Sequence, residues 1–169
     1  SISNILNCKS SEIFFTSGGS ESNNIILKGL LSSGDHLITS SYEHPSILAL
    51  SNELKEQGIE VTFIRPNQDG LIEPQKIKKA LKENTKLVSI MYVNNELGTI
   101  NPMDEIGEIC HKDNVLFHTD AVQYIGKEKI NLSDSKIDFL SIGAHKFYGP
   151  KGIGALYCKS GEKLHPLIS

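Results

Sequence analysis

The sequence predicts an α/β fold with a mostly parallel seven-stranded sheet flanked by helices, and three observations lead to that prediction. Short runs of β-branched and aromatic residues alternate along the chain with segments of helical periodicity. The chain has 169 residues, 38% of them hydrophobic, which is enough to bury the core of one domain. The last two predicted strands are joined by a connection too short for a crossover helix, so we expect the last strand to be antiparallel.

The predicted strands are short and mostly apolar. They cover Glu12–Thr16, His36–Ser40, Glu60–Ile64, Leu87–Tyr92, Val115–His118, Asp138–Ile142 and Gly154–Cys158. Helices are predicted over Ser20–Leu31, Ser46–Gln57, Glu73–Lys82 and Met103–His111. Helical spacing places a set of apolar residues of the first two helices toward the core, namely Ile25, Ile26, Leu30, Ile47, Leu50 and Leu54.

Composition and charge exclude several classes of function. The net charge is −3 and no stripe of basic residues recurs along one face, which argues against a nucleic-acid partner. No apolar run approaches the ~18 residues of a membrane span, and the first residues lack the features of a signal peptide. Three widely spaced cysteines indicate neither a disulfide framework nor a zinc site, which favours a reducing compartment.

Polar residues follow the first two predicted strands, at the sheet edge where α/β proteins bind ligands. Gly19 and Ser20 lie between a strand and a helix, where free backbone N–H groups can bind a phosphate. An ordinary N-cap turn explains them equally well. His44 precedes a proline that opens the next helix, and it can stack on a planar ligand, act as an acid or base, or be structural.

The fourth and fifth strands end in further polar residues. Asn94 and Asn95 can either bind a ligand oxygen or form a turn. Asp120 lies at the end of a buried strand, where a carboxylate needs a cationic partner or strong hydrogen bonds, and a protonated ring nitrogen would satisfy that need. A metal site of His118 and Asp120 is the alternative, although no further ligands occur at a suitable spacing.

Lys146 follows the sixth strand among small and apolar residues. Desolvation and neighbouring cations there are expected to lower the pKa of the amine and free it for a Schiff base, whereas a surface lysine is the alternative. A phosphate seat, a stacking histidine, an aspartate for a pyridinium nitrogen and an amine that captures an aldehyde are together what pyridoxal 5'-phosphate (PLP) requires. The sequence therefore predicts a PLP site, and no metal site.

The sequence resembles the PLP-dependent cysteine desulfurases of the class V aminotransferase superfamily in five segments, which are SGGSESNN, EHPSIL, NNELGTINP, FHTDAVQ and SIGAHKFYGPKGIGALY. The resemblance runs from about Glu12 to Tyr157. It implies the large domain of a type I PLP-dependent transferase fold over residues 1–169. It also implies that relatives carry an N-terminal segment and a C-terminal small domain that this chain lacks.

The resemblance implies a role for each matching residue. Lys146 matches the Schiff-base lysine that also moves protons at the substrate α-carbon, and Asp120 matches the carboxylate that keeps the pyridine nitrogen protonated. His44 matches the histidine stacked on the ring, which completes the three expected catalytic residues. The further cofactor contacts that it implies are Gly19 and Ser20 for the phosphate, Asn95 for cofactor or substrate, Gln123 for the phenolic oxygen, and His145 on the phosphate side.

The chain departs from the family pattern at two glycines. Relatives often have Ala-Thr where this chain has Gly19-Ser20, and the hydroxyl of Ser20 can replace that of threonine. Relatives commonly have a serine in place of Gly143, and its hydroxyl reaches the phosphate.

Two functional groups of the family have no match in this sequence. In relatives the nucleophilic cysteine and the arginine that binds the substrate carboxylate belong to the smaller domain. Cys8, Cys110 and Cys158 lie elsewhere in the pattern, and Arg65 lies at a remote turn. We therefore expect the isolated chain to be inactive and to bind PLP weakly at most, because relatives bind it at a homodimer interface.

For the parent protein, the resemblance implies removal of sulfur from L-cysteine, which yields L-alanine and an enzyme persulfide for iron–sulfur cluster or thio-cofactor assembly. The implied partners are L-cysteine, a second copy of the protein, and an iron–sulfur scaffold or another sulfur acceptor. A selenocysteine lyase or other class V PLP enzyme is one alternative, and a catalytically incomplete cofactor-binding fragment is another. The expected location is cytoplasmic, with mitochondria or plastids left open.

Overall fold

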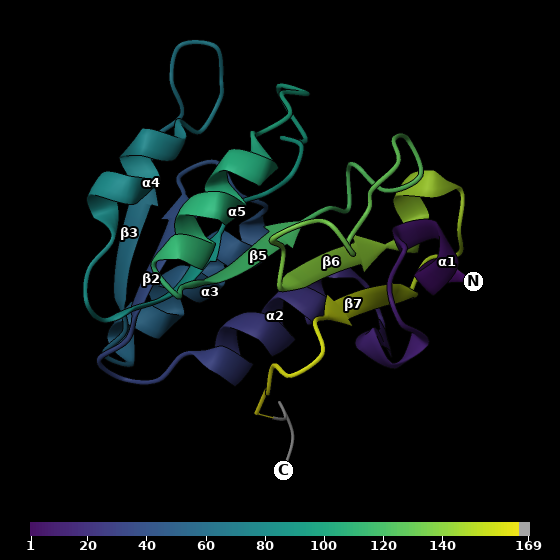
Figure 1. Ribbon diagram of the computed structural model, residues 1–169, viewed down its shortest axis with the longest axis horizontal. Helices are drawn as coiled ribbons and strands as arrows, with labels where there is room; N and C mark the ends of the chain where they lie inside the picture. The colour runs from purple at the N-terminus through teal and green to yellow at the C-terminus, as the bar shows by residue number, and fades with distance from the viewer. Residues whose placement is uncertain (166–169) are drawn as a thin grey trace.

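The computed structural model describes residues 1–165, and in it seven strands form one sheet in the order β1-β7-β6-β5-β4-β2-β3 (Figure 1). The strands are β1 (Ile13–Thr16), β2 (His36–Ser40), β3 (Glu60–Ile64), β4 (Thr85–Ser89), β5 (Leu116–Asp120), β6 (Phe139–Gly143) and β7 (Gly154–Cys158). Pairing is parallel from β3 through to β6, whereas β7 runs antiparallel to both β6 and β1. This confirms the predicted fold class and the antiparallel last strand.

Helices cover both faces of the sheet (Figure 1). The five helices among the described residues are α1 (Ile2–Leu6), α2 (Gly19–Leu30), α3 (Pro45–Glu56), α4 (Pro74–Ala80) and α5 (Met103–Lys112). Two short 3-10 turns cover Ser10–Glu12 and Ala144–Phe147. None of the helices in residues 1–165 is long and apolar enough to cross a membrane.

Each central strand contributes to two separate cores, because neighbouring strand residues point to opposite faces of the sheet. Leu37 and Leu87 pack with α2 and α3 on one face. Ile38 and Val88, the next residues along the same strands, pack with α4 and α5 on the other face. The nearly continuous apolar strands of the sequence are therefore the middle layer of a three-layer α/β/α sandwich.

Several predicted strand boundaries are wrong by one to three residues. β4 starts at Thr85, because this residue pairs with His36 of β2, and it ends at Ser89 rather than Tyr92. β5 continues to Asp120, which pairs with Ser141 of β6, so Asp120 belongs to the strand and does not follow it. Glu12 lies in the 3-10 turn before β1.

The buried face of α2 also differs from the prediction. Ile26 and Leu27 are fully buried, whereas Ile25 and Leu30 are only partly buried. The helix is rotated so that Ser22 and Asn23 also face the protein interior. In α3, by contrast, Ile47, Leu50 and Leu54 are buried as predicted.

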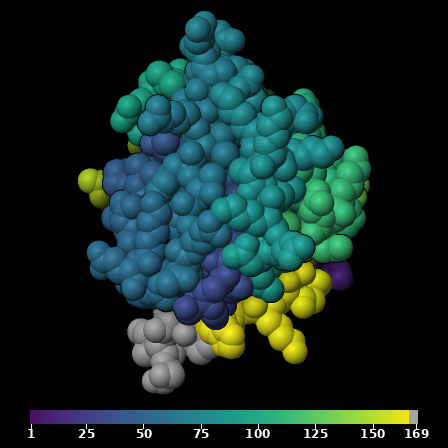
Figure 2. Space-filling view, turned by 90° about the vertical axis from the view of Figure 1, so that its left-hand side faces the viewer, coloured from purple at the N-terminus to yellow at the C-terminus, as the bar shows by residue number. Residues whose placement is uncertain are grey.

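β3 is an edge strand of the sheet and lies far from the carboxyl ends of β5 and β6. The segment from α3 to α4, in blue to teal, forms the surface on this side of the molecule (Figure 2). Arg65 directly follows β3 and is exposed to solvent. The turn that carries the chain's single arginine is therefore remote from the strand ends at the centre of the sheet.

Candidate functional site

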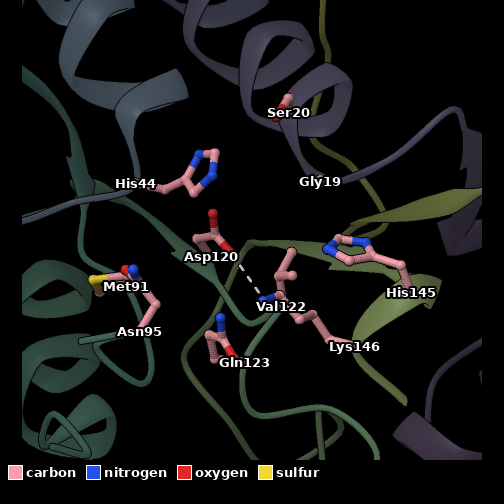
Figure 3. Close-up of a pocket in the computed structure, with 10 residues that line it drawn as sticks. All are labelled: Gly19, Ser20, His44, Met91, Asn95, Asp120, Val122, Gln123, His145 and Lys146. Atoms are coloured by element: carbon pink, nitrogen blue, oxygen red, sulfur yellow. Dashed lines mark hydrogen bonds between the residues drawn. The ribbon is translucent and has the colours of Figure 1, made fainter. Parts of the chain in front are cut away.

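A cavity of about 220 Å³ opens at the carboxyl ends of the strands. Its walls combine residues from five separate segments of the chain, and these residues lie around a common space (Figure 3). The lining residues are Gly19, Ser20, His44, Met91, Asn95, Asp120, Val122, Gln123, His145 and Lys146. All eight residues that the sequence analysis proposes for one site therefore lie around one cavity, and Met91 and Val122 are additions.

Asp120 ends β5 at the centre of this cavity and is 6% exposed. Its Oδ1 accepts a hydrogen bond from the backbone N–H of Val122 at 3.0 Å, and its Oδ2 accepts one from Nδ2 of Asn23 at 2.9 Å. Both donors are neutral, and within residues 1–165 no lysine, arginine or histidine forms an ion pair with this carboxylate. A buried carboxylate held in this way favours a cationic ligand group beside it.

His44 caps a helix and also lines the cavity. Its Nδ1 accepts a hydrogen bond from the backbone N–H of Ser46 at 3.2 Å, so the side chain caps the N-terminus of α3. The same ring lines the cavity, where His44 and Gln123 lie on opposite sides of Asp120 (Figure 3). The cap fixes the ring without covering it.

The two asparagines after β4 divide the roles that the sequence left open. Asn94 is buried and forms the turn, because its Oδ1 accepts from the backbone N–H groups of Glu96 and Leu97 at 3.0 and 2.8 Å. Asn95 is exposed and lines the cavity. Nearby, the rings of Tyr92 and Tyr124 stack with centroids 3.8 Å apart, which joins the segments after β4 and β5.

The N-terminus of α2 forms the end of the cavity that carries Gly19 and Ser20. The N-cap is Gly18, and no side chain caps the helix, so the backbone N–H groups of the first turn have no side-chain acceptor. A Cβ on Gly19 would lie 2.5 Å from Cγ2 of Val122, which shows how closely the helix approaches the loop after β5. This arrangement suits an anion.

His145 and Lys146 lie in the 3-10 turn that follows β6, and both line the cavity. Lys146 is exposed, so the desolvation expected from its small and apolar neighbours is wrong. The turn projects its side chain beyond the strand end, where solvent reaches it. A Cβ on Gly143 would lie 3.3 Å from Nδ1 of His145, so the extra side chain of a serine would fit only after a small shift of that ring.

His118 lies on β5 two residues before Asp120 and is fully buried. Its Nδ1 bonds to the hydroxyl of Ser89 at 2.8 Å and its Nε2 bonds to the hydroxyl of Ser141 at 3.0 Å. Burial lowers the pKa of His118 to about 3, so the ring is neutral. Both ring nitrogens are engaged, which excludes the alternative of a metal site formed with Asp120.

None of the three cysteines, all within the described residues, lines this cavity. Cys110 and Cys158 are buried, and burial raises the pKa of their thiols to about 12 and about 11. Burial and the nearby Glu12 also raise the pKa of Cys8. All three thiols are therefore protonated at neutral pH, and a thiol in that state is a poor nucleophile.

Sequence reasoning missed three polar residues that support the cavity from behind, namely Asn23, Glu43 and Ser46. Glu43 is buried directly before His44, and its Oε1 accepts hydrogen bonds from Ser40 and from the backbone N–H of Met91. A charged residue beside a loop gives no sequence signal of burial. Asn23 has one signal, because it lies one helical turn after Ser20.

The residues present fit PLP on the structural evidence alone. The uncapped helix start with Ser20 suits the phosphate, and the exposed amine of Lys146 is accessible to an aldehyde. Asp120 is a buried carboxylate that lacks a cationic partner in the described chain, which suits a protonated ring nitrogen. The donor set therefore matches the group at both of its ends.

The model of the family described as Aminotransferase class-V matches residues 1–169. The chain belongs to the class V aminotransferase family. Members of this family, which includes the cysteine desulfurases, are PLP enzymes.

Two of the three similar proteins reported below are cysteine desulfurases by name. A protein of Clostridium botulinum named cysteine desulfurase IscS is 49% identical over 99% of this chain and 43% of its own length. A solved structure titled SspA in complex with cysteine is 45% identical, with a TM-score of 0.95 over 99% of this chain and 50% of that one. The apo cysteine desulfurase of Thermococcus onnurineus NA1 is 33% identical, with a TM-score of 0.86 over 94% of this chain and 41% of that one. The chain thus spans less than half of the length of the named curated relative.

Proposed function

We propose that the protein to which this chain belongs is a PLP-dependent cysteine desulfurase, and that residues 1–169 are its cofactor-binding large domain. One observation carries the proposal: separate chain segments bring an amine, a buried carboxylate, a histidine that caps α3 and an uncapped helix start around a single cavity. The names of the relatives and their length support it. The reaction would convert L-cysteine to L-alanine and leave the sulfur as a persulfide on an enzyme cysteine.

PLP would supply an aldehyde for the amine and a ring that withdraws electrons from the substrate α-carbon. Lys146 would bind the aldehyde and move a proton at the α-carbon, since its amine is exposed to the cavity. Asp120 would hold the proton on the ring nitrogen, because a buried carboxylate stabilises an adjacent cation. His44 would cover one ring face, with Gln123 on the opposite side of Asp120 (Figure 3).

The remaining contacts would orient the cofactor at its two ends. Gly19, Ser20 and His145 would bind the phosphate, and Asn95 would contact the cofactor or the substrate. The chain alone would be inactive, because Cys8, Cys110, Cys158 and Arg65 all lie outside the cavity. The homodimer, a sulfur-acceptor protein such as an iron–sulfur scaffold, and a cytoplasmic location are part of the proposal for the whole protein.

The test is borohydride reduction of the full-length protein in the presence of PLP. We expect an absorbance band that reduction removes while linking the cofactor covalently to the peptide that contains Lys146. Lys146→Ala should abolish the link. Lys151→Ala is the matched control, because Lys151 is an exposed lysine of the same loop that does not line the cavity.

Turnover of L-cysteine and L-selenocysteine by the full-length protein distinguishes the desulfurase from the lyase alternative. Release of alanine from L-cysteine, lost in Lys146→Ala, would support the desulfurase. A strong preference for L-selenocysteine would favour the lyase alternative. Reduction of PLP onto a lysine other than Lys146, or no PLP binding by the full-length protein, would reject the proposed site.

A further inference from the structure

A continuous chain of hydrogen bonds joins His44 to Asp120 behind the cavity. Nδ2 of Asn23 lies 2.9 Å from Oδ2 of Asp120 and 3.1 Å from Oγ of Ser46. Oγ of Ser46 in turn lies 2.8 Å from Nδ1 of His44. The chain crosses three elements, since Asn23 is on α2, Ser46 is on α3 and Asp120 ends β5.

The carboxylate of Asp120 determines which group donates in each of these hydrogen bonds. An ionised carboxylate only accepts, so Asn23 must turn its NH₂ group toward Asp120. The flipped amide would place a carbonyl oxygen against the carboxylate, and in the observed orientation Oδ1 of Asn23 is buried with no partner among the described residues. The two hydrogens of the amide are then both in use, one on Asp120 and one on Ser46.

The hydroxyl of Ser46 accepts a hydrogen bond on one side and donates one to His44 on the other. Its hydroxyl oxygen accepts from Asn23, which leaves the single hydroxyl hydrogen for Nδ1 of His44. The backbone N–H of Ser46 points at the same Nδ1 from 3.2 Å. Two donors therefore converge on Nδ1, and a ring nitrogen that accepts both carries no hydrogen of its own.

We propose that Asn23 and Ser46 are positioning residues that couple Asp120 to His44 and hold the histidine ring in the form with its hydrogen on Nε2. The inference rests on the proposed function for the roles of His44 and Asp120. Under it, proton exchange at His44 uses Nε2, because Nδ1 is occupied from two sides. We call the hydrogen bonds that run from Asp120 through Asn23 and Ser46 to His44 the relay. The relay and the N-cap bond of His44 also keep the ring plane fixed relative to the carboxylate.

Asn23 and Ser46 differ in how much of the protein they support. Asn23 is fully buried and leaves Asp120 without a side-chain donor when it is replaced. Ser46 is only partly buried in the first turn of α3, so Ser46→Ala removes the relay with little change in packing. Ser46→Thr retains the hydroxyl and is the conservative variant.

The first test measures the hydrogen position directly by ¹⁵N NMR of the full-length protein labelled in histidine and free of cofactor, with His44→Gln used for assignment. We expect Nδ1 of His44 to be unprotonated in the wild type and in Ser46→Thr. Ser46→Ala and Asn23→Leu should increase the share of rings with hydrogen on Nδ1. A hydrogen on Nδ1 in the wild type, or a ratio unchanged in both variants, would overturn the inference.

The second test measures coupling through a double-mutant cycle on PLP affinity. We expect Asn23→Leu and His44→Gln each to raise the dissociation constant for PLP. If the two residues are coupled, the fold-increase in the double variant should be smaller than the product of the two single fold-increases, by a factor of about two or more. Asn24→Ala, combined with His44→Gln, should be additive, because within the described part of the chain Nδ2 of Asn24 bonds to the carbonyl of Ser20 in its own helix and to no other group. Additivity of Asn23 and His44 would overturn the coupling.

The two tests separate this inference from the proposed function. If the wild-type protein binds no PLP, the proposed function fails, while the NMR measurement still decides the position of the hydrogen on His44. If PLP binds through Lys146 but the ring carries its hydrogen on Nδ1, the function stands and the relay fails.

Discussion

Gly19 and Val122 approach so closely that a methyl group at position 19 would lie 2.5 Å from Cγ2 of Val122. The start of α2 and the loop after β5 therefore pack directly on each other at the end of the cavity. The contact leads to the first prediction.

Gly19→Ala should destabilise the protein by about 1–3 kcal/mol, the usual cost of forcing an extra carbon into a packed contact. Val122→Ala should restore most of that loss in the double variant, since it removes Cγ2, the methyl group at the contact. Thermal unfolding of the two single variants and the double variant tests this. Additive losses would contradict the direct contact.

Gly143→Ser should tighten PLP binding by about tenfold, the value of one added hydrogen bond to a charged group. The Cβ would lie 3.3 Å from His145 and from Val122, so only small side-chain shifts are required. Equilibrium dialysis of the full-length protein against PLP measures the change, with Gly143→Ala as the control that adds the carbon without the hydroxyl. Equal affinities for the serine and alanine variants would contradict a phosphate contact at this position.

The neutral His118 should make stability depend on pH in the acidic range. Burial lowers its pKa to about 3, below the value of about 6.5 in an unfolded chain. Between these values only the unfolded state binds the proton, so the free energy of unfolding falls as the pH falls, by at most about 1.4 kcal/mol per unit. Urea unfolding at several pH values should show a smaller slope for His118→Gln, whereas the exposed His111→Gln should keep the wild-type slope.

Glu43 should produce the opposite slope at higher pH. Burial, together with the charge of Asp120, raises the pKa of Glu43 to about 8. From its unfolded value near 4.3 up to 8, the folded state retains a proton that the unfolded state has lost, so stability falls as the pH rises. Glu43→Gln should therefore gain stability relative to the wild type between pH 5 and pH 8, measured by urea unfolding. A constant difference across this range would show that Glu43 is ionised in the folded protein.

The three cysteines of this chain should be dispensable for sulfur transfer. Burial raises the pKa of each thiol, and none of them lines the cavity. The triple Cys-to-Ala variant of the full-length protein should retain alanine production from L-cysteine and should still form a persulfide. Loss of the persulfide in a variant that still binds PLP would assign the sulfur acceptor to this chain.

The sequence predicted the sheet and the members of the site because both depend on local patterns. Strand runs and helical spacing are properties of a few residues each, and strand ends of a parallel sheet meet at one edge. That is why Asp120 and Lys146 could be brought together from positions far apart in the chain. The positions of these residues predicted only that they lie close together, and the family resemblance implied the role of each.

The details that the sequence missed depend on how elements are rotated and buried. Asn23 points inward because the buried face of α2 is rotated by about one residue from the face that the apolar spacing predicts. Glu43 reads as a solvated loop residue, although the end of β4 buries it. Lys146 was expected among apolar neighbours, but the 3-10 turn extends it into solvent. Each of these outcomes is set by tertiary packing.

The pairing of β1 with β7 has a consequence for synthesis of the protein. Ile13 pairs with Tyr157, and among the strands of residues 1–165 only β7 lies beside β1 in the sheet. Among the seven strands of residues 1–165, β1 is synthesised first and β7 last, so β1 cannot pair until β7 has been made. Since β1 leads directly into the helix start at Gly19, the anion-binding end of the cavity would be among the last parts of this domain to form during translation.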